Sequence, residues 1–310
     1  MRYFKYIWIG VLSLALLSCD KEPPITDAML DGDLIFDPSL YEPEKFLVSA
    51  RVPNPSAADL EKHVIIAIHG YTATTFEWQE FADWSKDSSY MVSQVLLDGH
   101  GRTYKEFKAS TWQDWLKPIV QEYEKLLALG YTKISFVGSS TGGALLLELL
   151  SNQFFENKTA PKNIFLVDVI VVPTIKLQSI AGLVGPMLVY VETDQTAVED
   201  SFWYRFRPQE TINELNKLIA NVQYKLEKGI IASNGTHVHV FQSKYDPTSS
   251  ATGAVLMYKG LKHKDGTRIK VDIMDSDIHV FTRLSLRQNI TEKYKENQLF
   301  AFRQISQKLR

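Results

Sequence analysis

Cysteine is almost absent from the sequence, which contains 310 residues and a single cysteine, Cys19. A disulfide framework and a metal site built on cysteines each need several, so the sequence excludes both. An excess of one charge is also missing, because 34 Lys and Arg residues oppose 36 Asp and Glu residues, for a formal net charge of −2. Without a basic run, nothing indicates nucleic acid as a partner. The composition that is left, 45% hydrophobic and 23% charged, is typical of a globular domain.

The N-terminal residues have the pattern of an export signal. Arg2 and Lys5 are basic, and the apolar run from Ile7 to Leu17 is shorter than the ~20 residues that span a bilayer. The following Leu16-Leu17-Ser18-Cys19 resembles the lipobox of bacterial lipoproteins, in which the signal is removed and the cysteine is acylated. We therefore expect a signal peptide at 1–18, lipidation of Cys19 and a tether at 19–33. This predicts a lipid anchor in a membrane of a bacterial cell envelope, on its periplasmic or exposed side.

Strands and helices alternate from His63 to the end of the sequence. Strands are expected at 63–68, 90–97, 133–137, 163–172, 236–241 and 268–273. The first is a continuous β-branched run, which is typical of a strand buried on both faces, whereas 236–241 alternates. Helical spacing predicts helices at 77–86, 111–129, 248–259 and 283–309. Two short strands are expected earlier, around 34–36 and 46–52. The alternation indicates one α/β domain over 34–310, with a mostly parallel sheet between two layers of helices.

The region 174–229 breaks this alternation. It contains an apolar segment at 180–190, an aromatic cluster at 202–206, and a helix with a single apolar stripe. We expect a helical cap here, inserted after a central strand and covering an acyl or alcohol pocket. An extra packing layer without a gating role is the alternative.

A turn of small residues separates the expected strand at 133–137 from a helix that is apolar nearly all round. It contains Gly138-Ser139-Ser140-Thr141-Gly142, the Gly-x-Ser-x-Gly pattern of a nucleophile elbow. A sharp bend from strand to helix requires small residues two positions before and two positions after the serine. It also places the Ser140 hydroxyl near a helix N-terminus, where developing negative charge is favoured. Ser140 is therefore the candidate nucleophile, and an ordinary turn is the alternative.

A serine nucleophile needs a base to take its proton, and in α/β hydrolases the base follows the serine in sequence. Four histidines follow Ser140. His237 and His239 lie within an expected strand, and His263 lies in a polar turn. His279 follows the last strand and an acidic loop and precedes the last helix, which makes it the candidate base.

The histidine in turn needs an acid that holds its tautomer. Asp246 lies in the loop after the penultimate strand, beside the position expected for the last strand, and is the preferred candidate. Asp168, within or at the end of an earlier strand, is an alternative position. Asp275 and Asp277 share the loop of His279 and stand too close to it in sequence to orient its ring.

Acyl transfer also needs two backbone N–H donors for the tetrahedral intermediate. The residue after the nucleophile, Thr141, supplies one of them. The loop after the first core strand, His69-Gly70-Tyr71, offers the Tyr71 amide as the other, and Gly70 lets the backbone turn close to a substrate. His69 has no spaced partner that would make it a metal ligand, so we interpret it as a packing residue of the loop.

Five motifs follow one another at natural spacing, and each of them alone is weak. They are His69-Gly70-Tyr71-Thr72, Leu97-Asp98-Gly99-His100-Gly101, Gly138-Ser139-Ser140-Thr141-Gly142-Gly143, Asp246 and Ser276-Asp277-Ile278-His279-Val280. Together they resemble the α/β-hydrolase superfamily, in the branch of carboxylesterases and monoacylglycerol lipases, over about residues 63–310. The Arg207-Pro208 segment is similar to the cap region of those esterases. Two positions depart from the pattern: Asp98 replaces a usual proline, and Gln242-Ser243 replaces a usual glycine.

The resemblance implies a serine hydrolase that cleaves a small ester. Ser140 would be the nucleophile, His279 the base and Asp246 its orienting acid, with Tyr71 and Thr141 as the oxyanion hole. It implies neither a cofactor nor a metal. Thioester, amide or glycan O-acetyl substrates for the same residues are one alternative, and a binding lipoprotein without activity is the second. Neither the preferred acyl chain nor an oligomeric state follows from the sequence.

Overall fold

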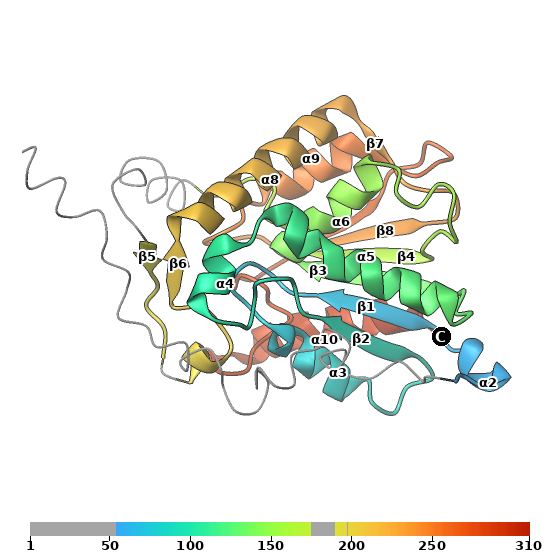
Figure 1. Cartoon of the computed structure of the whole chain (residues 1–310), viewed down its shortest axis with the longest axis horizontal. Helices are drawn as coiled ribbons and strands as arrows, with labels where there is room; N and C mark the ends of the chain where they lie inside the picture. The colour runs from blue at the N-terminus through green and yellow to red at the C-terminus, as the bar shows by residue number, and fades with distance from the viewer. Residues whose placement is uncertain (1–53, 175–189, 197) are drawn as a thin grey trace, which may run out of the picture.

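The computed structural model describes residues 54–174, 190–196 and 198–310 (Figure 1). At its centre six strands form one sheet in the spatial order β10-β8-β4-β3-β1-β2. Their bounds are β1 (Val64–Ile68), β2 (Met91–Val95), β3 (Ile134–Ser139), β4 (Asn163–Val167), β8 (His237–Ser243) and β10 (Lys270–Met274). Every neighbouring pair is parallel. The parallel sheet predicted from the alternation is confirmed.

Helices cover both faces of this sheet. One layer contains α5 (Trp112–Ala128), α6 (Thr141–Ser151), α8 (Gln209–Lys228) and α9 (Thr252–Gly260), and the other contains η3 (Thr75–Trp78), α3 (Gln79–Trp84) and α10 (Glu292–Gln307). Figure 1 shows α8 and α9 on one side of the strands and α3 and α10 on the other. In β1, Val64, Ile66 and Ile68 pack in the first layer, whereas Ile65 and Ala67 pack in the second. A strand with period-2 side chains between two layers must be apolar throughout, as this one is.

The direction of strand addition reverses between β1 and β3. From β1 the chain passes to β2 on one side, and β3 then pairs with the other side of β1, with Ile68 beside Gly138. Ligands of open parallel sheets bind beyond the carboxyl ends of the strands at such a point, because the adjacent loops leave in opposite directions. The loop at 69–72 and Ser140 follow these two strands, so the topology places both at that crevice.

The described part of the region 174–229 forms a short ribbon and a long helix. β5 (Tyr190–Glu192) pairs antiparallel with β6 (Phe206–Pro208), and η5 (Glu199–Ser201) lies between them in sequence. Figure 1 shows this ribbon at one end of the molecule, where α8 begins. α8 buries Leu218 and Val222 in the core beside α6, so it belongs to the helical layer. Most of the apolar segment at 180–190 lies outside the described residues.

Two expected elements were predicted too long. The strand expected at 163–172 ends at Val167, because Asp168 has a φ of +45°, which does not continue an extended strand. The helix expected at 283–309 begins only at Glu292, since positive φ values at Leu286 and Asn289 keep the preceding residues irregular.

Four short elements complete the described chain, and the sequence pattern did not predict them. They are α2 (Ala57–Leu60), α4 (Tyr104–Ala109), β7 (Ile230–Ile231) and β9 (Leu261–Lys262). The expected signal peptide, Cys19 and the strands around 34–36 and 46–52 lie outside the described residues. Within the described ranges, no helix is both long and apolar enough to cross a bilayer.

Candidate active site

Ser140 lies at the sharp turn between β3 and α6. Its backbone has a φ of +46° and a ψ of −114°, a combination that residues other than glycine rarely adopt and that is often found at functional sites. The turn is held on both sides. The Ser140 amide donates to the carbonyl oxygen of Val167 at 2.9 Å, and its carbonyl oxygen accepts from the amide of Ala144 at 3.2 Å. The bend predicted from the Gly-x-Ser-x-Gly pattern is present.

Two glycines make this bend possible. A Cβ on Gly138 would lie 2.7 Å from backbone atoms of Gly142 and Gly143, and a Cβ on Gly142 would lie 2.5 Å from the carbonyl oxygen of Ile68. Both distances are well below van der Waals contact, so a larger residue at either position would force the backbone apart. The start of α6 therefore packs directly on the end of β1.

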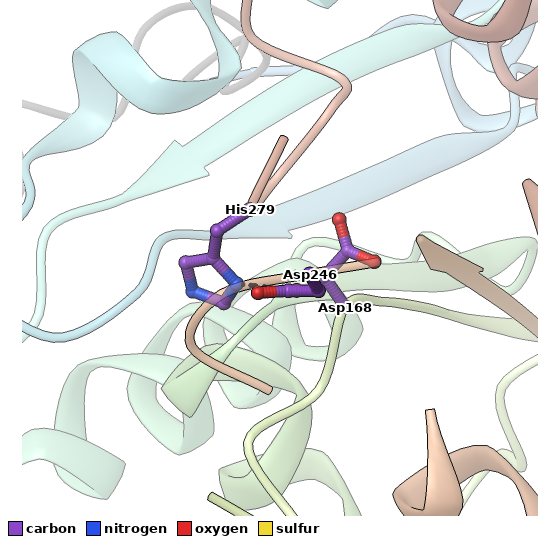
Figure 2. A group of neighbouring side chains, drawn as sticks. All are labelled: Asp168, Asp246 and His279. Carbon is purple, nitrogen blue, oxygen red and sulfur yellow. Dashed lines mark hydrogen bonds and ion pairs between the residues drawn. The ribbon is translucent and has the colours of Figure 1, made fainter. Parts of the chain in front are cut away.

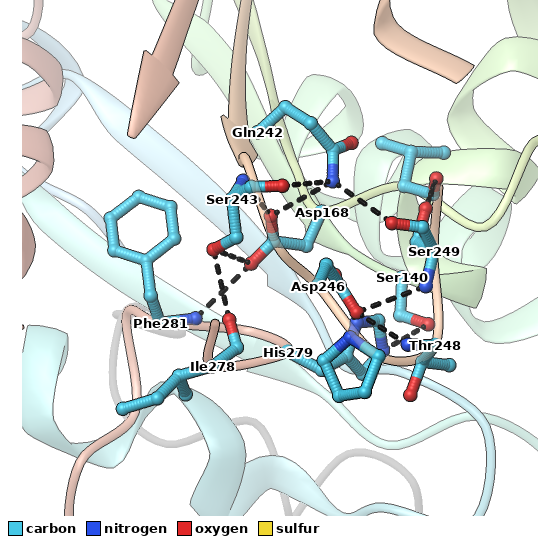
Figure 3. Close-up of polar contacts among 12 residues, drawn as sticks. Ser140, Asp168, Gln242, Ser243, Asp246, Thr248, Ser249, Ile278, His279 and Phe281 are labelled. Atoms are coloured by element: carbon cyan, nitrogen blue, oxygen red, sulfur yellow. Dashed lines mark hydrogen bonds and ion pairs between the residues drawn. The ribbon is translucent and has the colours of Figure 1, made fainter. Parts of the chain in front are cut away.

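His279 lies between Ser140 and Asp246 (Figure 3). Its Nε2 is 3.0 Å from Ser140 Oγ, and its Nδ1 is 2.8 Å from Asp246 Oδ2. The other oxygen of Asp246 accepts from the amides of Thr248 at 2.7 Å and Ser249 at 2.9 Å. Because its own turn holds the carboxylate, the imidazole is oriented with Nε2 toward the serine. The fold thus brings together the three residues predicted as nucleophile, base and acid, each from the end of a different strand.

The charges around His279 favour its protonated form. Burial by itself lowers the pKa of the imidazole, but the negative charges of Asp246, Asp168 and Glu77 outweigh it and raise the pKa above the ordinary value of 6.5. A raised pKa makes the neutral imidazole a stronger base once it has lost its proton. The electrostatics therefore suit proton transfer to and from Nε2.

A second buried carboxylate, Asp168, lies beside the first (Figure 2). Its Oδ1 accepts from the amide of Ser243 at 2.6 Å, and its Oδ2 accepts from the amide of Phe281 at 3.2 Å. The Gln242 side-chain amide lies 3.3 Å from Oδ1 (Figure 3). Asp168 therefore joins β8 to the loop that carries His279. The residues that depart from the family pattern, Gln242 and Ser243, are both partners of this carboxylate.

Asp168, Asp246 and His279 are the group in the described chain that could hold a metal ion, because their ligand atoms lie within 4.8 Å of one another. Burial and the nearby Asp246 charge raise the pKa of the Asp168 carboxyl. The donor atoms are already engaged, however, since both carboxylates accept from backbone amides and Asp246 also contacts Nδ1. A cation would have to displace these donors, so the group suits hydrogen bonding better than metal ligation.

Tyr71 and Thr141, the predicted oxyanion donors, both line the cavity at Ser140. Thr141 is the first residue of α6, so its amide has no acceptor within the helix. Gly70 packs so closely that an added Cβ would lie 3.1 Å from the Ser140 Cβ, and its own amide donates to Glu77 Oε1 at 2.7 Å. With that N–H directed to Glu77, the amide of Tyr71 is the next one along the loop that a substrate oxygen could reach.

Two charged residues that the sequence pattern did not single out support the site. Glu77 is buried and accepts from both the Gly70 amide and the Ser139 hydroxyl, which joins the 69–72 loop to the strand before Ser140. Arg287 donates to the carbonyl oxygen of His279 at 2.5 Å. Both residues lie in segments whose apolar spacing predicts helices. That spacing reports packing, so it did not indicate a role for either charged side chain.

The cavity at Ser140 has a volume of about 170 Å³. Its apolar walls come from the segment after β4, from β5 and from α8, through Ile170, Pro173, Val191, Ile212, Leu215 and Ile219. Its polar members besides Ser140 and His279 are Tyr71, Thr141, Arg207, Asn216 and Thr248. An apolar cavity of about 150 Å³ is large enough for a molecule the size of benzene. This cavity therefore suits the reacting part of a small molecule.

The remaining candidates lie elsewhere. His239 contacts Asp272 at 2.8 Å on neighbouring strands, and the His263 Nε2 accepts from a backbone amide at 3.1 Å. Asp277 accepts from the Tyr294 hydroxyl at 2.6 Å on the surface. His69 is buried, and its Nε2 accepts from the Leu97 amide at 3.0 Å. None of these side chains lines the described cavity.

Solved structures share the architecture. The structure of the metagenome-derived lipolytic enzymes LipS and LipT aligns with a TM-score of 0.61 and 20% identity, over 78% of this chain and 94% of the other. A soluble variant of monoglyceride lipase from Saccharomyces cerevisiae, solved with a substrate analog, aligns with a TM-score of 0.63 and 14% identity. The alignment covers 80% of this chain and 86% of that chain. The molecule therefore has the α/β-hydrolase fold.

Sequence comparison gives a more limited likeness. A carboxylesterase from Bacillus subtilis (strain 168) is 27% identical over 97 residues, which are 31% of this chain and 39% of that relative. The match thus spans well under half the length of this relative. No protein-family model matches the sequence. The comparisons thus show the α/β-hydrolase fold over most of the chain and a sequence likeness to a carboxylesterase over one stretch of 97 residues.

Proposed function

We propose that the protein is a serine hydrolase that cleaves carboxylic esters, of the carboxylesterase or monoacylglycerol-lipase type. The observation that carries the proposal is the chain of contacts from Ser140 through His279 to Asp246, 3.0 Å and 2.8 Å long, beside a largely apolar cavity. A hydroxyl becomes an effective nucleophile when a base within hydrogen-bond reach takes its proton and an acid orients that base.

In the first half-reaction the Ser140 oxygen attacks the ester carbonyl carbon while His279 Nε2 accepts the hydroxyl proton. The Asp246 carboxylate stabilises the resulting imidazolium. The carbonyl oxygen becomes negative, and the amides of Tyr71 and Thr141 donate to it. The intermediate collapses when its bond to the alcohol oxygen breaks, and the alcohol leaves with the proton from His279.

In the second half-reaction water takes the place of the alcohol. His279 accepts a proton from the water as its oxygen attacks the acyl carbon, and a second tetrahedral intermediate forms at the same two amides. Collapse breaks the bond to Ser140 Oγ, which recovers its proton from His279. The carboxylic acid leaves, and the enzyme returns to its starting state.

Hydrolysis of 4-nitrophenyl esters, from acetate to palmitate, tests the proposal with the full chain and with Ser140→Ala. We expect turnover by the wild type and a loss of about 10⁴-fold or more in the variant, because only binding and the oxyanion donors are left to it. A serine-directed phosphonate should label the wild type and leave the variant unlabelled. The ester with the highest kcat/KM then measures how much acyl chain the cavity accepts.

Equal turnover by wild type and variant would show that Ser140 is not the nucleophile. Absence of both turnover and labelling would overturn the proposal as a whole. Labelling of Ser140 without hydrolysis of these esters would keep the serine hydrolase and change the bond, to a thioester, an amide or a glycan O-acetyl group.

We propose further that Cys19 carries lipid and holds the protein at a membrane of a bacterial cell envelope. The support is the order of three features in the sequence: basic residues at the start, an apolar run, and then Leu16-Leu17-Ser18-Cys19. In a bacterial host, labelled palmitate should enter the full chain and not Cys19→Ser. Equal incorporation into both would contradict the lipid anchor.

A further inference from the structure

Arg207 of β6 lines the cavity at Ser140, and no anionic partner for it is found in the described chain. Its Nε is buried without a hydrogen-bond partner. Among the described residues its guanidinium lies over the ring of Tyr71, with 6.0 Å between the guanidinium carbon and the ring centroid. Residues 175–189, which the structure does not describe, contain no Asp or Glu.

Arg205, two residues earlier, shows how the same segment accommodates a structural arginine. Its guanidinium contacts both carboxylate oxygens of Asp200 at 2.6 to 3.2 Å and donates to the carbonyl oxygen of Gln195 at 2.8 Å. In the described part of the chain Arg207 has no comparable set of hydrogen-bond acceptors, and burial lowers its pKa. A buried charge is costly unless it is paired. The two arginines therefore differ in their compensating anion: Arg205 has one in Asp200, whereas Arg207 has none among the described residues and faces a cavity that an anion could enter.

The surroundings of Arg207 strengthen its attraction for an anion. Among the described residues no carboxylate lines the cavity, and most of its wall is apolar. Electrostatic interactions are stronger next to a low-dielectric wall than in water. A guanidinium also presents parallel N–H donors that match the paired oxygens of a carboxylate or a phosphate.

We propose that Arg207 binds an anionic group of the substrate, a carboxylate or a phosphate, so that the preferred substrates are esters that carry a negative charge. The inference rests on the proposed esterase function and specifies the substrate class of that same site. Arg207 and Ser140 line one cavity of about 170 Å³, so the anion and the scissile carbonyl lie within a few bonds of each other in the substrate. A neutral ester would leave the guanidinium, whose Nε is buried, without an anionic partner among the described residues.

Two matched pairs of esters test the inference on the full chain. The first pair compares monoethyl adipate, which has a free carboxylate, with neutral ethyl hexanoate. The second compares 1-butyrylglycerol 3-phosphate with neutral 1-butyrylglycerol, so the pairs separate a carboxylate from a phosphate. The released acid is titrated at constant alkaline pH, and kcat/KM is measured for wild type, Arg207→Gln and Arg207→Lys. Arg303→Gln, which removes an exposed cation on α10, is the matched control.

We expect the wild type to prefer the anionic ester in at least one pair. Arg207→Gln should lower kcat/KM for that ester by about 10- to 100-fold, as expected for loss of a charged hydrogen bond. For the neutral ester of the same pair, kcat/KM should change by less than about threefold. Arg207→Lys keeps the charge without the planar arrangement of N–H donors, so its kcat/KM for the anionic ester should lie between those of the wild type and Arg207→Gln. Arg303→Gln should leave the ratio within each pair unchanged.

Equal losses on both esters of each pair would overturn the inference, because they would assign Arg207 a structural role through Tyr71. A wild-type preference for the neutral ester in both pairs would overturn it as well. Failure of the proposed function looks different: the wild type would then hydrolyse none of the four esters and take no phosphonate label at Ser140. That result would remove the esterase and, with it, this substrate class.

Discussion

Two buried carboxylates stand at the ends of neighbouring strands, and they make different contacts. Asp246, after β8, directs one oxygen to Nδ1 of His279 and the other to amides of its own turn. Asp168, after β4, instead accepts from the amides of Ser243 and Phe281, which belong to two separate segments. One carboxylate orients an imidazole, and the other joins β8 to the loop that carries the imidazole.

The difference shows that an acid near a histidine need not be the one that orients it. The charge of Asp168 is close enough to raise the pKa of His279, yet its hydrogen bonds go to the backbone. Nδ1 donates a single hydrogen, and Asp246 accepts it. The Asp168 carboxylate can therefore accept from the backbone amides of Ser243 and Phe281 instead. We therefore expect the same substitution at the two positions to have different effects.

Asp246→Asn should have the largest effect. An amide in this position favours the wrong tautomer of His279 and removes the charge that stabilises the imidazolium, so kcat should fall by about 10⁴-fold. Asp272→Asn is the matched control, because Asp272 makes a 2.8 Å contact to His239 away from the cavity, and this variant should keep full ester hydrolysis. Near-normal turnover by Asp246→Asn would show that another group orients the imidazole.

The pH dependence of the wild type should be the next largest effect. Ester hydrolysis requires neutral His279. Burial lowers the pKa of this residue, but the carboxylates around it raise the pKa above 6.5 overall. Below that pKa each pH unit should lower kcat/KM about tenfold, and above it the profile should become flat. A pH series on one ester measures the midpoint, and a midpoint below 6.5 would contradict this account of the charges.

Asp168→Asn tests the other half of the comparison with the same pH series. The substitution removes one of the charges that raise the pKa of His279, so the acid limb should move to lower pH. At alkaline pH, kcat/KM should stay within about tenfold of the wild type, since the Ser140 and Asp246 contacts to the imidazole are retained. Asp272→Asn, with no charge lost near the cavity, should keep the wild-type midpoint.

Either of two results would break the comparison. A loss near 10⁴-fold in Asp168→Asn would give the two carboxylates equal weight in catalysis. An acid limb that does not move would mean that the charge of Asp168 does not reach the imidazole.

Much of the fold was predictable, because apolar periodicity reports which faces of an element are buried. All residues of β1 are apolar, and all are buried between the two helical layers. The same signal misled at the end of β4, where Val169 to Val171 continue the apolar run and are buried after the chain has turned at Asp168. Hydrophobicity reports burial and carries no information about a φ of +45°.

In the site, the Gly-x-Ser-x-Gly pattern selected Ser140, and chain order and loop position then selected His279 and Asp246 as candidates. Their separations of 3.0 Å and 2.8 Å depend on strand register, which no local pattern supplies. Glu77 had no signal in the sequence, and Arg207 was noted only as part of a segment similar to an esterase cap. Their roles at the 69–72 loop and at the cavity follow from the fold.

Ser243→Ala should have the smallest effect, because it removes one link to Asp168 and leaves the charges in place. The Ser243 hydroxyl lies 3.2 Å from Asp168 Oδ2 and 2.9 Å from the carbonyl oxygen of Ile278. The hydrogen bond from the Ser243 backbone amide to Asp168 is kept in the variant. We expect the free energy of unfolding to fall by about 1 kcal/mol, measured by urea denaturation. Ser151→Ala, whose hydroxyl donates to a carbonyl of its own helix, controls for loss of a hydroxyl outside the site.

The pH midpoint of Ser243→Ala separates geometry from charge. Both carboxylates are retained in this variant, so its acid limb should coincide with that of the wild type even though the link to Ile278 is lost. If the limb moved as far as in Asp168→Asn, the hydroxyl would account for the shift that we assign to the carboxylate. The pKa of His279 would then depend on how the loops are held, and the two carboxylates would differ in their contacts alone.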